Sequence, residues 1–160
     1  MITFTVLDTC EKERWLPVLF DLFYDNMQEI APSELPYEQE KQQWLSEVSL
    51  ALEKAPRQII LCFVGGVLAG YVQYYTNGKL LMIEEIQLKK AYQRTTLFYS
   101  LCKHLATRLP PGLETIEAFA IKQNLHSRKL MQKLGMTQID EDDNFVHLRG
   151  STWEIRRIFE

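Results

Sequence analysis

The spacing of apolar residues predicts helices in the first third of the chain and strands in the middle. Apolar positions in 11–27 and 37–54 recur at intervals of three and four residues, as they do on one face of a helix. Residues 2–7, 59–64 and 67–75 instead form short, nearly continuous apolar runs, which are typical of strands.

Two glycine-containing turns connect the middle strands into a meander. Gly65-Gly66 separates the runs at 59–64 and 67–75, and Asn77-Gly78 precedes a third run at 80–88. Both dipeptides favour two-residue hairpin turns because glycine and asparagine tolerate a positive φ. We therefore expect three consecutive antiparallel strands.

The second half of the chain alternates strand and helix patterns. The predicted elements are a helix after Arg94 that ends before Pro110, a strand at 114–121, a helix at 125–134 closed by Gly135, and closing strands at 136–139 and 153–159 around an acidic turn at 141–144. The order β-α-α-β-β-β-α-β-α-β-β predicts an α/β fold (mixed α+β) with a mixed sheet and helices on both faces, not a regular Rossmann alternation. No repeat or linker divides the chain, so we expect a single domain over residues 1–160.

The composition argues against several classes of protein. Hydrophobic residues make up 46% of the 160 residues, charged residues 24%, and the net charge is -3, which provides no basic surface for nucleic acid or anionic lipid. No apolar run approaches the roughly 18–20 residues that a membrane helix needs, and the N-terminus has no signal-peptide pattern. The three cysteines form no CxxC pair. We expect a cytoplasmic protein without nucleic-acid or membrane partners.

The histidines indicate neither a metal site nor a nucleophilic triad. His104, His126 and His147 lack the spacing of metal ligands, so we expect no metal. Ser127 follows His126 on a predicted helix, where adjacent residues do not face each other.

The segment from Leu88 to Phe98 is the strongest functional signal. It follows an apolar strand and opens an amphipathic helix, so its backbone N–H groups are free at the positive end of a helix dipole, where phosphate binds. The Thr96 hydroxyl and the Arg94 charge would add contacts to phosphate oxygens. Gln93 and Arg94 are equally compatible with a solvated loop.

A second segment, from Asn124 to Met136, completes a recognisable pair of motifs. The first segment follows the pattern Val-x-Pro-x-Tyr-Arg/Gln-x-x-Gly-x-Gly/Ala through Leu88, Tyr92 and Gln93. The second follows Asn-x-x-Ala/Ser-x-x-Leu-Tyr-x-x-Leu-Gly-Phe through Asn124, Ser127, Leu130, Leu134, Gly135 and Met136. Together they resemble motifs A and B of the GNAT N-acetyltransferase superfamily.

The resemblance implies a GNAT-like fold and an acetyl-CoA-dependent reaction. Its central twisted sheet would have about seven strands, splayed between strands four and five, and acetyl-CoA as co-substrate would enter that gap. The residues that would hold it are Ile86, Gln87, Leu88, Gln93, Arg94, Thr95, Thr96, Leu97, Phe98, Asn124, Ser127 and Met131. An acetyl group would pass by direct attack to a primary amine of an unidentified small molecule or peptide. Asn124 would also suit the N-cap of the following helix.

Glu84 and Glu85 are the candidate general bases, because the family often uses a carboxylate on the fourth strand to take a proton from the amine. Consecutive strand residues point to opposite faces, so one of the two should face the cleft. If Ile86 and Leu88 pack in the core, Glu85 points to the other face of the sheet. A bulge in the strand would change this count.

Four positions depart from the family pattern. Lys90 replaces its proline, Thr96 and Phe98 replace its two small residues, and Met131 replaces a tyrosine that often protonates the leaving thiolate. These departures favour a rival hypothesis, a catalytically inactive GNAT-fold ligand-binding or interaction module. An unrelated α/β binding domain is a third reading, which predicts no splay between strands four and five. A monomer and a homodimer remain equally open.

Overall fold

A computed structural model describes residues 1–54 and 56–159 of the chain. Its elements are β1 (Ile2–Val6), η1 (Thr9–Glu11), α1 (Lys12–Ile30), α2 (Tyr37–Lys54), β2 (Arg57–Val64), β3 (Val67–Asn77), β4 (Leu80–Leu88), η2 (Lys90–Tyr92), α3 (Leu97–Arg108), β5 (Thr115–Ile121), α4 (Leu125–Lys133), β6 (Thr137–Glu141), β7 (Phe145–Ser151) and α5 (Thr152–Ile158). The strands form one seven-stranded sheet in the order β1-β2-β3-β4-β5-β7-β6. Only the β4–β5 pair is parallel. The predicted α/β class and mixed sheet are confirmed.

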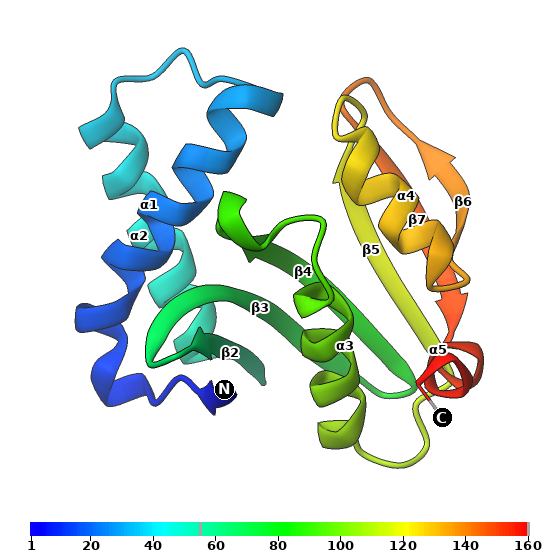
Figure 1. Ribbon diagram of the computed structural model, residues 1–160. Coiled ribbons are helices and arrows are strands. Elements are labelled where there is room, and N and C mark those ends of the chain that lie inside the picture. Colours follow the sequence, from blue (N-terminus) through cyan, green and yellow to red (C-terminus); the bar gives the residue numbers. More distant parts are fainter. Residues whose placement is uncertain (55, 160) are drawn as a thin grey trace.

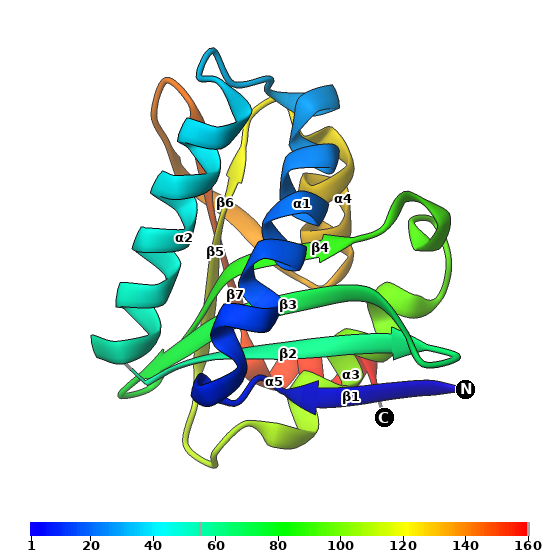
Figure 2. The same ribbon diagram turned by 90° about the vertical axis from the view of Figure 1, so that its left-hand side faces the viewer.

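Helices cover the two faces of the sheet and create two apolar cores. On one face, α1 and α2 pack on β2 and β3 through Leu19, Ile59, Leu61 and Tyr71. On the other face, residues of α3, α4 and α5 pack on the sheet in one larger cluster. Figures 1 and 2 show α1 and α2 as a pair on one side and α3 on the opposite side. No helix within residues 1–54 and 56–159 combines the length and apolar character needed to cross a bilayer.

The two predicted hairpins connect β2, β3 and β4. Val64 pairs with Val67, so Gly65 and Gly66 form a two-residue turn, and both have positive φ. In the second hairpin Asn77 pairs with Leu80, which places the turn at Gly78 and Lys79, one residue later than the Asn-Gly signal. The expected three-stranded meander is therefore confirmed.

The end of the chain differs from the sequence prediction. Residues 145–151 form β7, whereas 153–159, predicted as a strand, lie mostly in helix α5. The Ser151 hydroxyl accepts the N–H of Trp153 at 3.2 Å and caps this helix. Thr152 and Ile155 are buried three residues apart while Trp153 is exposed. The apolar residues of this segment therefore follow a helical period that the strand prediction did not recognise.

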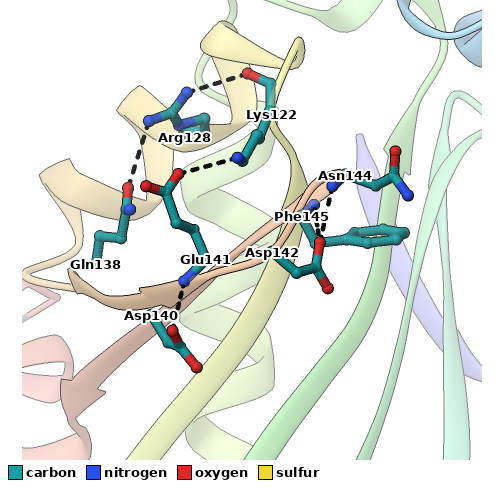
Figure 3. A network of polar contacts seen from close by, with 8 residues as sticks. All are labelled: Lys122, Arg128, Gln138, Asp140, Glu141, Asp142, Asn144 and Phe145. Carbon is teal, nitrogen blue, oxygen red and sulfur yellow. Dashed lines mark hydrogen bonds and ion pairs between the residues drawn. The ribbon is translucent and has the colours of Figure 1, made fainter.

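A polar network fixes α4 against the β6–β7 hairpin (Figure 3). Arg128 of α4 donates to the Lys122 carbonyl at 3.0 Å and to Gln138 of β6 at 3.4 Å. The Lys122 ammonium pairs with Glu141 at 3.1 Å. Asp142 accepts the N–H groups of Asn144 and Phe145, and these bonds lower the pKa of its carboxyl. The acidic turn predicted at 141–144 is thus an ordered hairpin that holds α4 in place.

Gly70 allows β3 to lie close to the end of β4. It pairs with Leu88, and a Cβ at this position would come within 2.5 Å of the Gln87 carbonyl oxygen and of a Leu88 methyl group. We expect Gly70→Ala to lower the free energy of unfolding by about 1–3 kcal/mol, because the added carbon must push β4 aside. Urea denaturation measures this change.

Gly66→Asn is the matched control for this substitution. No atom lies within 4 Å of a Cβ at Gly66, and asparagine tolerates its positive φ, so this variant should remain close to wild type. Equal stability of the two variants would contradict the close-approach argument.

Candidate active site

The sheet opens between β4 and β5. The two strands pair only from Leu80↔Thr115 to Ile83↔Ala118, although β4 continues to Leu88 and β5 to Ile121. Figure 1 shows the two strands diverging beyond their paired ends. The predicted splay between the fourth and fifth strands is confirmed, which removes the ground for an unrelated α/β domain.

An extra residue in β4 lies just where this splay begins. Tyr74 of β3 pairs with Ile83, but the preceding Gln73 pairs with Glu85, so Glu84 has no partner in the ladder. This is a β-bulge, which interrupts the alternation of side chains. The prediction that only one of the two carboxylates would face the cleft is wrong, because the bulge turns both toward the α1–α2 face.

Contacts on that face establish the orientation of both carboxylates. Glu84 accepts a hydrogen bond from the Arg57 guanidinium at 2.7 Å, and that guanidinium also stacks on Tyr75 at 4.8 Å from the ring centroid. Glu85 accepts a hydrogen bond from the side-chain amide of Gln87, which in turn contacts Asn26 of α1. Glu84 is therefore neutralised by a cation, and Glu85 is not.

The environment of Glu85 changes its acidity. Desolvation by the surrounding protein raises the pKa of the Glu85 carboxyl to about 7, the hydrogen bond from Gln87 opposes this shift, and the neighbouring Glu84 charge adds to it. The hydroxyl of Tyr71, fully buried nearby, has no hydrogen-bond partner among the described residues. A carboxyl with a pKa near 7 suits a general base at neutral pH.

A pocket of about 350 Å³ occupies the splay beside this site. It is lined from α1 by Asn26, Glu29 and Ile30, from β4 and the following turn by Ile86, Gln87, Leu88, Lys90, Gln93, Arg94 and Thr95, from α3 by Phe98 and Tyr99, and from the β5–α4 region by Gln123, Asn124, Leu125, His126, Ser127, Leu130 and Met131. All the predicted cofactor residues line this pocket except Thr96 and Leu97. Leu97 is buried in the core, and Thr96 occupies the N-cap position of α3 without a side-chain cap bond.

The turn before α3 has the features of an anion site. Arg94 has a φ of 64°, a left-handed conformation that non-glycine residues rarely adopt. The Thr95 hydroxyl donates to the Tyr92 carbonyl at 2.6 Å and accepts the Leu97 N–H at 3.2 Å. In the described chain, the N–H groups of Phe98 and Tyr99 have no acceptor. Free N–H groups at a helix N-terminus beside a cation fit a phosphate group.

Phe98 does not close the pocket. Its side chain is 5% exposed and belongs to the core cluster of α3, where its ring meets that of Tyr99 edge-on at 5.6 Å. Phe98 is one of the residues that line the pocket. The replacement of a small residue by phenylalanine at this position is therefore accommodated by burial in the core.

The residues of motif B both stabilise helix α4 and line the pocket. The Asn124 side chain accepts the Ser127 N–H at 3.1 Å, which confirms its predicted N-cap role, and it also borders the pocket. Met131 is buried at the pocket wall and offers no proton donor.

The principal residue missed from the sequence is Asn26. Its side chain is buried, and its amide donates to the Gln87 side chain at 2.9 Å and to the Leu88 carbonyl at 2.8 Å. Its sequence signal is a polar residue three after Phe23 and four after Leu22, on the apolar face of α1. A polar side chain at a core position requires a buried partner, and that requirement points to the site.

Comparison with known proteins agrees with this geometry. The model of the acetyltransferase (GNAT) family matches residues 16–136. The chain belongs to the GNAT acetyltransferase family. The family identifies the chain as an acyltransferase with acetyl-CoA as its acyl donor. No curated protein sequence gives a significant match.

Solved structures of similar fold support the assignment. The PaiA N-acetyltransferase of Thermoplasma acidophilum, in complex with coenzyme A, superimposes with a TM-score of 0.75 at 15% identity, over 94% of this chain and 99% of that one. An acetyltransferase of Thermus thermophilus gives a TM-score of 0.76 at 14% identity, over 94% and 97%. The ribosomal-protein-S18-alanine N-acetyltransferase of Escherichia coli gives 0.65 at 17%, over 95% and 94%. At these identities the likeness concerns the fold.

The raised pKa of Glu85 predicts a pH-dependent stability. The folded state binds the Glu85 proton more tightly than the unfolded chain does, so stability falls as pH rises from about 4.5 to about 7. We expect Glu85→Gln to raise Tm relative to wild type at pH 8 and to have little effect near pH 4.5, where the wild-type carboxyl is protonated. Thermal unfolding at both pH values measures this difference. An equal effect at both pH values would contradict the desolvated carboxyl.

Proposed function

We propose that this protein transfers the acetyl group of acetyl-CoA to a primary amine of a small molecule or peptide by direct attack, with Glu85 as general base. The observation that carries the proposal is the position of Glu85. A desolvated carboxyl without a cationic partner faces the α1–α2 side of the splay, next to a pocket with an anion site at its end.

Binding of the donor follows from the lining of the pocket. Backbone groups of Ile86 and Leu88 are available to the pantetheine arm where β4 leaves β5, and the turn from Gln93 to Phe98 offers N–H groups and the Arg94 charge to the pyrophosphate. Asn124 and Met131 border the same channel from α4. The residues present therefore fit acetyl-CoA.

The roles of the two carboxylates divide according to their partners. Glu85 accepts a proton from the ammonium form of the acceptor, because only the neutral amine has a lone pair that can attack the thioester carbonyl. As the new C–N bond forms and the C–S bond breaks, the attacking nitrogen loses its second proton, and a water molecule passes this proton to the leaving thiolate, since Met131 has none to give. Glu84 is held by Arg57 in an ion pair, so we assign it no proton transfer.

The rival proposal is a GNAT-fold binding module without catalysis. Met131 favours it, and so does the Leu88 carbonyl, which already accepts Asn26 at 2.8 Å and Gln93 at 3.0 Å. A pantetheine amide must displace one of these donors before it can use that oxygen. The acetyltransferase proposal predicts turnover of an amine that depends on Glu85. The binding-module proposal predicts no turnover.

The decisive experiment compares acetyl-CoA binding with amine acetylation. We expect micromolar binding of acetyl-CoA and of free CoA by isothermal titration calorimetry. With an acceptor found in an amine screen, Glu85→Gln should lower kcat by roughly 10²–10⁴-fold and abolish the acid limb of the pH profile near pH 7. Glu84→Gln is the control, and it should keep that limb. Binding without turnover of any amine would favour the binding module. No binding at millimolar concentration would contradict the acetyltransferase proposal and leave a binding module for a different ligand.

Arg94 provides a test of the anion site that is separate from catalysis. We expect Arg94→Gly to weaken CoA binding roughly tenfold, because it removes a charge-assisted contact. The same change should leave stability equal or higher by about 1 kcal/mol, because glycine adopts a φ of 64° without strain. Titration calorimetry and thermal unfolding measure the two effects.

Lys103→Ala is the charge-matched control. Lys103 is exposed on α3, the helix that follows Arg94, and does not line the pocket, so its loss should leave CoA affinity nearly unchanged. Equal losses in the two variants would indicate a general charge effect without a phosphate contact at Arg94.

A further inference from the structure

A chain of side-chain amides runs from the cofactor pocket to Glu85. Gln93 donates to the Leu88 carbonyl at 3.0 Å and to the Asn26 side-chain oxygen at 3.3 Å. Asn26 donates to the same carbonyl at 2.8 Å and to the Gln87 side-chain oxygen at 2.9 Å. Gln87 then donates to Glu85. Both Asn26 and Gln87 are buried, so the two bonds that Asn26 donates are shielded from water.

The direction of these hydrogen bonds is fixed by the two ends of the chain. The Leu88 carbonyl can only accept, so it orients the amide nitrogen of Asn26 toward itself. The same nitrogen also meets Gln87, which must present its oxygen and therefore turns its own nitrogen toward Glu85. An ionised carboxyl accepts this bond, and the arrangement favours the carboxylate over the acid.

Gln87 is the sole side chain in the described residues that donates a hydrogen bond to Glu85. Glu84 on the same strand repels the Glu85 charge, and Arg57 of β2 neutralises Glu84. Tyr71 faces Glu85 from β3 with an unpartnered hydroxyl. On this face of β5 the acidic group is Glu117, which Arg149 of β7 binds at 2.7 Å and His147 of β7 approaches at 3.1 Å. From α1, the polar side chain in this network is the uncharged Asn26.

We propose that Gln87 and Asn26 are positioning residues for the general base, and that they link the Leu88 end of the cofactor pocket to the protonation of Glu85. Gln87 holds the carboxylate, and Asn26 holds Gln87 in the orientation that allows it to donate. A ligand N–H that binds the Leu88 carbonyl displaces Asn26 or Gln93 from it. Binding of acetyl-CoA would therefore act on Glu85 through Asn26 and Gln87. This inference rests on the proposed role of Glu85 as base.

The first test follows the titration of Glu85 directly and does not require turnover. In protein labelled with ¹³C at glutamate carboxyls, the Glu85 signal is identified by its loss in Glu85→Gln. We expect Gln87→Met, which keeps the length of the side chain and removes its donor, to raise the Glu85 titration midpoint by about one pH unit. Asn26→Leu should raise it by less. An unchanged midpoint in Gln87→Met would overturn the proposal.

Gln43→Met is the matched control. Gln43 also donates to a glutamate carboxylate, that of Glu47 at 3.2 Å, but on the exposed surface of α2. This variant should leave the Glu85 midpoint unchanged. A shift equal to that of Gln87→Met would overturn the specific role of the amide chain.

The second test examines the link to the pocket. Free CoA should shift the Glu85 midpoint in wild type, and at least half of that shift should disappear in Asn26→Leu, although the charges of CoA are the same in both. An equal shift in the two proteins would overturn the link. With an active acceptor, the acid limb of kcat/KM should move upward in Gln87→Met. If no amine is acetylated while these midpoints still shift as expected, the proposed catalysis is wrong. The link from the pocket to Glu85 through Asn26 and Gln87 is then still supported.

Discussion

The bulge in β4 is the constraint on which the rest of this site depends. Beyond Ile83 the parallel ladder with β5 ends, and the next residue, Glu84, is the one without a partner on β3. Without this added residue, regular alternation would point Glu84 and Glu85 to opposite faces. The bulge brings both carboxylates to the α1–α2 face, and it does so at the point where the sheet opens. An irregularity in the ladder is thus the means by which the fold places both carboxylates on one face beside the splay.

Burial then gives the two neighbouring carboxylates different chemistry. Glu84 reaches Arg57 across β3 and is paired with its guanidinium, whereas Glu85 has only the amide donor of Gln87. Desolvation therefore raises the pKa of the Glu85 carboxyl. Helix α1 supplies Asn26, so the position of α1 determines how Glu85 is connected to the pocket through Gln87. In the proposed mechanism, this single helix would couple the acceptor side of the splay to the side that binds acetyl-CoA.

Most of the fold was predictable from the chain because its local signals agree with its tertiary structure. The meander, the splay and nearly all the pocket residues of motifs A and B were predicted from periodicity, turn residues and family resemblance. The orientation of Glu84 was not, because a bulge depends on pairing with β3 and leaves no mark in composition. Asn26 was missed because its role depends on a hydrogen bond to Gln87, 61 residues away in the sequence. The final helix was missed because its apolar residues are few, and the Ser151 cap is a weak signal on its own.

The departures from motif A have different physical consequences. Phe98 substitutes bulk for a small residue, and the core of α3 absorbs that bulk without filling the pocket. Lys90 replaces a proline and pairs with Glu29 of α1 at 2.6 Å at the rim, so a cation stands where phosphate groups would pass. Both partners of that pair are largely exposed, so the pair is weak and salt-sensitive, and Lys90 is readily released to a stronger anion. Met131 is different, because its thioether has no proton to give in place of the tyrosine hydroxyl. Donor binding is therefore well supported by the geometry, and any weakness of the enzyme should lie in the departure of the thiolate.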